Sequence, residues 1–179
     1  MHIPYITDEL LNRAAQIRLA VFDVDGVLTD GRLYFLPDGS EVKVFNSQDG
    51  LGLQMLREAG VSTAIISGRG GAALEKRAKN LGIAHLYQNC HNKLDALLEL
   101  CQQHQLDFAQ IAHLGDDLPD LPLIRRVGLG MAVANANAFV RAQAHAVTVA
   151  QGGEGAAREF CELILHAQGK LAAMRAAWL

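Results

Sequence analysis

Residues 19–31, LAVFDVDGVLTDG, indicate the fold class. Their opening run of apolar residues shows no alternation, which is typical of a strand buried on both faces of a parallel sheet. Asp23 and Asp25 follow this run at once. Carboxylates beside a buried strand cost free energy unless their charge is neutralised. The rest of the sequence is therefore expected to bring cations or a metal ion to this point.

The composition is that of a globular protein. With 179 residues, half of them hydrophobic, the chain is expected to form a single domain spanning 1–179. Sixteen Lys and Arg against 19 Asp and Glu give a formal net charge of −3, which excludes a generally basic surface for nucleic acid or an anionic membrane. The three cysteines form no CxxC pair. Neither a signal-peptide pattern nor an apolar run of about 18 residues is found, so the expected location is cytoplasmic.

Strand-like and helical patterns alternate along the chain. This alternation predicts an α/β fold in three layers, with a parallel sheet between helices. Two short alternating segments flank the turn PDGS at 37–40 and predict a β-hairpin inserted at about 31–46. A glycine-rich loop at 151–155 precedes a last helix, expected to run from about Ala156 toward the end of a tail at about 151–179. The gaps between motifs leave no room for a large cap domain.

Polar side chains come directly after several predicted strands. Ser67 follows VSTAII, Asp116 follows IAHLG, and Lys93 begins the helix after IAHLY. Ligands of parallel sheets gather at the carboxyl ends of the strands. We therefore expect these three side chains to share one site with the two aspartates after the first strand.

The residue types in this site favour a magnesium ion and a phosphate. Mg²⁺ prefers oxygen ligands, usually one or two carboxylates together with substrate phosphate, which suits Asp23 and Asp116. The Ser67 hydroxyl, the backbone N–H groups of the following GRGG and the Lys93 ammonium can surround phosphoryl oxygens. Of Asp23 and Asp25, one can attack phosphorus and form an aspartyl-phosphate while the other serves as general acid and base. The sequence thus predicts phosphoryl transfer.

In order along the chain, DVDGVLTDG, IISGR, Lys93 and GDDLPD resemble the motifs of the haloacid dehalogenase superfamily of phosphohydrolases. The likeness runs from about residue 10 to residue 171 and includes FNSQDGLGLQML, LGIAHLYQ and GGEGAARE. Within the superfamily, the set is similar to phosphatases that remove the terminal phosphate of an eight-carbon keto sugar acid in lipopolysaccharide precursor synthesis. The resemblance implies a Rossmannoid three-layer sandwich without a large cap, and a Mg²⁺-dependent phosphomonoesterase that works through an aspartyl-phosphate.

The resemblance also implies a role for each acidic residue. Asp23 is the expected nucleophile and a magnesium ligand, and Asp25 is the expected general acid and base, which also binds the metal through its backbone carbonyl. Asp116 is then the other carboxylate ligand. The residues implied to support the metal shell are Asp117 and Asp120, and those implied to hold the phosphoryl group are Ser67 and Lys93.

Substrate contacts and assembly follow from the same resemblance. The implied contacts are Asn46, Ser47, Gln48, Asp49, Gly50, Gln54, Gly68, Arg69, Arg77, Lys93 and Arg158. Gln54 stands where many relatives carry a basic residue, so one sugar-side contact differs here. Members of the family form tetramers in which the hairpins assemble and the glycine-rich tail reaches a neighbouring site. We therefore expect a homotetramer acting on a small sugar phosphate, with Arg158 near an adjacent active site.

Three other functions are open to these residues. A phosphatase of a nine-carbon sialic-type sugar 9-phosphate shares the catalytic core and differs only at its rim. A phospho-receiver module is also an α/β domain with aspartates, Mg²⁺ and a lysine, but its phosphorylated aspartate follows a later strand. A non-catalytic relative should lack the second aspartate of the pair, whereas Asp25 is present. The seven histidines show no ligand spacing and are expected to be structural or exposed.

Overall fold

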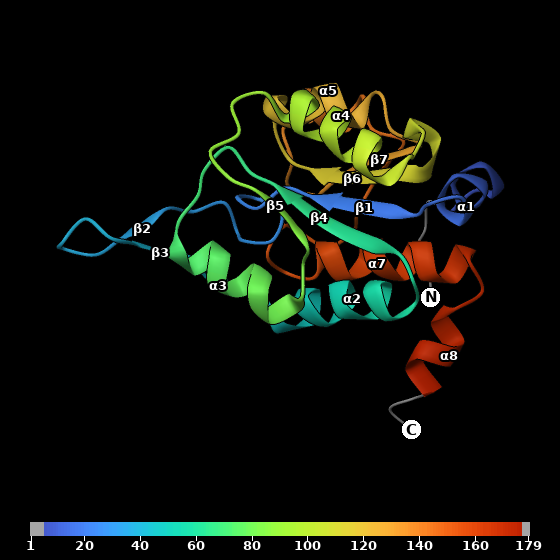
Figure 1. Ribbon diagram of the computed structural model, residues 1–179, viewed down its shortest axis with the longest axis horizontal. Helices are drawn as coiled ribbons and strands as arrows, with labels where there is room; N and C mark the ends of the chain where they lie inside the picture. Colours follow the sequence, from blue (N-terminus) through green and yellow to red (C-terminus); the bar gives the residue numbers. More distant parts are fainter. Residues whose placement is uncertain (1–5, 177–179) are drawn as a thin grey trace.

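A parallel sheet of six strands forms the centre of the computed structural model, which describes residues 6–176 (Figure 1). The ends of the expected domain and tail, residues 1–5 and 177–179, lie outside the described residues. In sheet order the strands are β5 (His85–Tyr87), β4 (Ser62–Ile66), β1 (Leu19–Phe22), β6 (Ile111–Gly115), β7 (Leu129–Ala132) and β8 (Ala146–Val147). β1 pairs in parallel with β4 on one side and β6 on the other. The predicted α/β fold is confirmed.

Helices cover both faces of the sheet. On one face lie α1 (Asp8–Ala15), α2 (Ser47–Glu58), α3 (Ala72–Leu81), α6 (Ala138–Arg141) and α7 (Ala156–Ala167), and on the other lie α4 (Lys93–His104) and α5 (Leu121–Ile124). Figure 1 shows α4 and α5 above the sheet and α2 and α7 below it. Alternate residues of β1 enter the two cores: Phe22 meets the Phe160 ring edge-on at 5.5 Å, whereas Val21 packs in the opposite core. Burial on both faces explains why this strand shows no polar alternation.

A side-chain cap moves the start of α2. The helical pattern predicts a start near residue 51, but the Asn46 side chain accepts the N–H of Gln48, so the helix begins at Ser47. The predicted substrate-contact segment 46–50 is consequently the cap and first turn of a helix. Two 3₁₀ turns, η1 (Phe108–Gln110) and η2 (Leu118–Asp120), lie before and after β6.

The predicted hairpin is present and projects from the body of the molecule (Figure 1). Its strands are β2 (Tyr34–Phe35) and β3 (Glu41–Val42), paired antiparallel. Among the described residues, six of the ten large apolar side chains that are exposed lie on this arm: Leu33, Tyr34, Phe35, Leu36, Val42 and Val44. An exposed apolar concentration of this kind is typical of interaction surfaces.

The tail differs from the single continuous helix that the sequence predicts. α7 ends at Ala167 and a shorter helix, α8 (Leu171–Ala176), follows. Gly169 has φ +68°, and the N–H of Lys170 bonds to the carbonyl of Leu165, which closes α7 with a left-handed turn. Within residues 6–176, no helix is both long and apolar enough to cross a membrane.

Candidate active site

The predicted polar residues meet at the carboxyl edge of three adjacent strands. Asp23 follows β1, Ser67 follows β4 and Asp116 follows β6, and β1 lies between the other two strands. A pocket of about 290 Å³ opens here. It is lined by Asp23, Asp25, Ser67, Gly68, Arg69, Lys93, Asp116, Asp117, Pro119 and Asp120. The catalytic and metal candidates are therefore brought together as the strand order requires.

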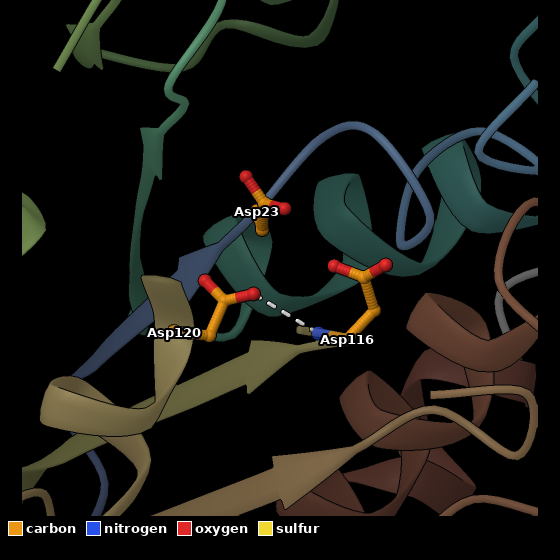
Figure 2. A group of neighbouring side chains, drawn as sticks. All are labelled: Asp23, Asp116 and Asp120. Atoms are coloured by element: carbon orange, nitrogen blue, oxygen red, sulfur yellow. Dashed lines mark hydrogen bonds between the residues drawn. The ribbon is translucent and has the colours of Figure 1, made fainter. Parts of the chain in front are cut away.

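Three carboxylates gather in this pocket, as Figure 2 shows. Asp23, Asp116 and Asp120 each offer an oxygen, and these oxygens lie within 4.8 Å of one another. Burial and the negative charge of Asp120 raise the pKa of Asp23 to about 6. Burial, Asp120 and Asp23 raise the pKa of Asp116 to about 8. This concentration of oxygen ligands, whose charge the protein's own cations do not fully offset, fits a hard divalent cation such as Mg²⁺.

The turn after Asp25 is shaped to leave room for Asp116. Gly26 has φ +90°, and a Cβ atom at this position would overlap the Asp116 carboxylate. Glycine meets both demands because it lacks that atom and tolerates the left-handed backbone.

Lys93 links two of the acids. Its side chain is 4% exposed, and its Nζ atom lies 2.7 Å from Oδ1 of Asp23 and 2.7 Å from Oδ1 of Asp120. Burial lowers the pKa of Lys93 by disfavouring its charged form, but the negative charges of Asp120 and Asp23 together have the larger effect, so the pKa is raised overall. At neutral pH this position therefore carries a fixed positive charge beside the expected nucleophile.

Asp120 anchors this arrangement. Besides the contact with Lys93, Oδ1 of Asp120 lies 3.1 Å from Nε2 of His113, and Oδ2 accepts the N–H groups of Asp116 and Asp117 at 3.0 and 3.3 Å. Burial opposes ionisation, but the His113 hydrogen bond and the Lys93 charge hold the pKa of Asp120 below its ordinary value. Asp120 thus holds both Lys93 and the loop that carries Asp116, a precise role that the sequence did not indicate.

Replacement of Lys93 by Met is expected to destabilise the protein by about 3 kcal/mol, because it leaves two buried carboxylates without their cation. Urea unfolding at pH 8 in the presence of a chelator measures this loss. Lys76→Met removes an exposed lysine of α3 in the same way and should change the free energy of unfolding by less than about 0.5 kcal/mol. Equal effects of the two substitutions would contradict this account of Lys93.

Asp25 interacts with one cation from the hairpin arm and one from the loop after β4. Its carboxylate contacts the ammonium of Lys43, and Nε of Arg69 lies 3.7 Å from its Oδ2. Arg69 also donates from Nη2 to Oε2 of Glu41 at 2.9 Å. The sequence analysis missed Lys43, Glu41 and His113. A signal for Lys43 was available, since a charged residue between Val42 and Val44 indicates that one side of this arm is polar.

The remaining predicted substrate contacts lie outside this pocket. Asn46 donates to the carbonyl of Gly153 at 3.1 Å and lines a separate hollow with Asp30, Phe45 and Glu154. Ser47 and Gln48 are exposed in the first turn of α2, and Gln54 is half-buried in the same helix.

Three of these predicted contacts serve the fold within this chain. Asp49 is 2% exposed and its carboxylate accepts the N–H groups of Gly155 and Arg158, so it caps α7 and is not open to a substrate here. The Arg77 guanidinium occupies the space that a Cβ atom on Gly50 would need. It donates to the carbonyl of Asn46 at 2.9 Å and stacks over the Phe45 ring. The Arg158 guanidinium pairs with Glu162 at 2.7 Å.

The glycine-rich loop lies against the turn that follows Asp25. A Cβ atom on Gly152 would overlap the carbonyl oxygen of Gly26, and one on Gly153 would press on the backbone of Thr29 and Asp30. The N–H of Gly152 is held by Oδ1 of Asn135 at 2.9 Å. Within one chain, this loop therefore supports the backbone next to the expected acid and base.

Comparison with known proteins agrees with this geometry. Residues 82–160 match the family model of haloacid dehalogenase-like hydrolases. The 3-deoxy-D-manno-octulosonate 8-phosphate phosphatase of Yersinia pestis is 48% identical over 166 residues, which cover 93% of this chain and 89% of that protein.

Solved structures match over nearly the whole chain. A probable YrbI family phosphatase from Pseudomonas syringae has a TM-score of 0.95 and 63% identity, with 96% of this chain and 98% of that one covered. The 3-deoxy-D-manno-octulosonate 8-phosphate phosphatase of Moraxella catarrhalis, solved with magnesium, phosphate and KDO, has a TM-score of 0.95 and 42% identity, with 97% and 100% covered.

Proposed function

Since the chain belongs to the 3-deoxy-D-manno-octulosonate 8-phosphate phosphatases, a family of haloacid dehalogenase-like hydrolases, we propose that it hydrolyses that sugar phosphate. The products are 3-deoxy-D-manno-octulosonate and phosphate, and Mg²⁺ is required. The observation that carries the proposal is the meeting of Asp23, Asp25, Asp116 and Lys93 in one pocket. We place the reaction in lipopolysaccharide precursor synthesis, in the cytoplasm.

In this proposal, Asp23 is the nucleophile. Lys93 holds its Oδ1 at 2.7 Å, which orients the carboxylate and leaves Oδ2 to attack phosphorus. The new bond joins Oδ2 to phosphorus as the bond from phosphorus to the sugar oxygen breaks, giving an aspartyl-phosphate. Ser67, whose Oγ accepts the N–H of Arg69 at 3.2 Å, and Lys93 hold the phosphoryl oxygens.

Asp25 acts as the general acid and then as the general base. It donates a proton to the departing sugar oxygen and then accepts one from the water that attacks the aspartyl-phosphate, which releases phosphate and restores Asp23. Its carboxylate lies on the hairpin side of the pocket, where the sugar leaves.

The carboxylates of Asp23 and Asp116 and the backbone carbonyl of Asp25 would hold the magnesium ion, with Asp117 and Asp120 supporting the loop. The ion supplies positive charge to the phosphoryl oxygens as negative charge develops on them. The raised pKa values of Asp23 and Asp116 fit this ligand set. At the rim, the exposed guanidinium of Arg69 suits the sugar carboxylate, because a guanidinium matches carboxylate geometry.

A panel of sugar phosphates with Mg²⁺ tests the proposal by measuring phosphate release. We expect kcat/KM to be highest for 3-deoxy-D-manno-octulosonate 8-phosphate. For a nine-carbon sialic-type sugar 9-phosphate, whose phosphatases share the catalytic core and differ only at the rim of the pocket, it should be at least about tenfold lower. A preference for the nine-carbon substrate would transfer the assignment to that class. No phosphate release from any member of the panel would overturn the phosphatase assignment.

We also propose that four copies assemble through the hairpins, with the glycine-rich tail of one copy reaching a neighbouring site and Arg158 near that adjacent pocket. The exposed apolar side chains of the arm support a contact of this kind. Phe35→Asp, at a residue 61% exposed, is expected to reduce the tetramer to smaller species in analytical ultracentrifugation. Leu98→Asp, at an exposed leucine of α4, should leave the tetramer intact. A fully active wild-type monomer would contradict the assembly.

A further inference from the structure

The hairpin arm carries a buried cation that contacts Asp25, one of the residues that line the pocket. Lys43 directly follows β3 between two exposed valines, yet its side chain is only 4% exposed. Its ammonium contacts Oδ1 of Asp25 and lies 3.1 Å from Oε1 of Glu41. Lysine is seldom buried unless it is paired, so the paired contact holds the side chain in this position.

Arg69 completes a closed set of charges around Asp25. Its Nη2 donates to Oε2 of Glu41 at 2.9 Å and its Nε lies 3.7 Å from Oδ2 of Asp25. Glu41 therefore ties the two cations together, and two positive charges balance two negative ones. The Oδ1 atom of Asp25 is engaged by a buried partner, whereas the ion pair of Oδ2 is with the more distant arginine, and Asp25 lines the pocket.

We propose that Lys43 is a positioning residue that holds the carboxylate of Asp25 in one orientation toward the leaving oxygen. The inference rests on the proposed function and adds that the hairpin takes part in the chemistry as well as in assembly. An aspartate side chain on a turn can otherwise rotate about two bonds. Proton transfer requires a donor within about 2.6–3.2 Å of the acceptor, so lost orientation lowers the rate of the chemical step.

Steady-state kinetics of three variants tests this role. Lys43→Met keeps the apolar stem and removes the charge, and we expect kcat to fall about 10- to 100-fold with KM changed less than about threefold. Lys43→Arg restores a cation and is expected to recover most of kcat. The control Lys76→Met removes an exposed lysine and should leave both constants unchanged.

A double-mutant cycle separates positioning from a structural role. If Lys43 acts through Asp25, then Lys43→Met lowers kcat in the wild type but has little further effect in Asp25→Asn. Equal losses in the two backgrounds, or unchanged kcat in Lys43→Met, would overturn the inference. The wild-type rate reports separately on the proposed function.

A crystal structure of Lys43→Met provides a readout that does not need activity. We expect Asp25 to occupy several rotamers in the variant and one in the wild type. A single unchanged rotamer in the variant would overturn the positioning role even if the enzyme proved to act on another phosphate ester.

Discussion

Asp23→Asn is expected to lower phosphate release at least about 10⁴-fold, because an amide cannot attack phosphorus to form the acyl phosphate. The fold should survive the change, since the Asn carbonyl oxygen can still accept the hydrogen bond from Lys93, which lies 2.7 Å from the carboxylate in the wild type. Phosphate release in the presence of Mg²⁺ and thermal unfolding measure the two effects.

Asp8→Asn is the matched control for Asp23→Asn. It makes the same chemical change at an exposed position in the first turn of α1, which does not line the pocket. Its activity should equal that of the wild type. If Asp23→Asn kept more than about 1% of the wild-type rate, the nucleophile would have to be reassigned.

Removal of Mg²⁺ is expected to make stability fall as the pH rises from about 5.5 to 8.5. In the folded protein, burial and neighbouring acids raise the pKa of Asp23 to about 6 and that of Asp116 to about 8, both from an ordinary value of 3.8. A raised carboxyl pKa means that the folded state binds the proton more tightly than the unfolded state does. The stabilisation that this proton gives is therefore complete below about pH 4 and is lost as the pH rises through the raised pKa values.

The expected size of this effect is a few kcal/mol, because one pKa unit corresponds to about 1.4 kcal/mol. Mg²⁺ should reverse it at pH 8 by binding the ionised carboxylates, with a gain of about 2.7 kcal/mol at one hundred times the dissociation constant. Chemical unfolding across the pH range, with Mg²⁺ or with a chelator, measures both quantities. The stability that the lowered pKa of Asp120 contributes is constant above about pH 4 and is lost only at lower pH, outside this window.

Asp116→Asn isolates the source of the pH dependence. The variant should show a flatter profile without metal and little stabilisation by Mg²⁺, because it lacks both the titrating group and a ligand. Asp8→Asn should keep the wild-type profile and the full response to Mg²⁺. A wild-type protein that Mg²⁺ does not stabilise at pH 8 would argue against the metal site.

The fold and the centre of the site could both be predicted from sequence. The uninterrupted apolar run before Asp23 indicated a strand buried on both sides, and β1 is in fact the strand between β4 and β6. Polar residues directly after strands then had to share one edge, because parallel strands end on the same side. Asp23, Ser67 and Asp116 line one pocket for this reason.

The helix limits and rim residues were harder to predict. The start of α2 depends on a cap from Asn46, and the end of α7 depends on a left-handed turn at Gly169. The family resemblance implies that Asp49 contacts substrate, and the structure adds that its carboxylate caps α7, which lies more than one hundred residues away in sequence. A local pattern holds no information about such a distant partner.

The parallel sheet and the meeting of the carboxylates at one edge can be predicted from the sequence, because strand burial on both faces and the alternation of strands with helices are visible along the chain. The pairing of individual charges depends on how the elements pack: Asp120 anchors Lys93, His113 contacts Asp120, and Lys43 reaches Asp25 from the hairpin. The physical reason is that ion pairs and buried hydrogen bonds depend on distances of about 3 Å between side chains. Those distances are set by how separate elements pack, and spacing along the chain does not specify them.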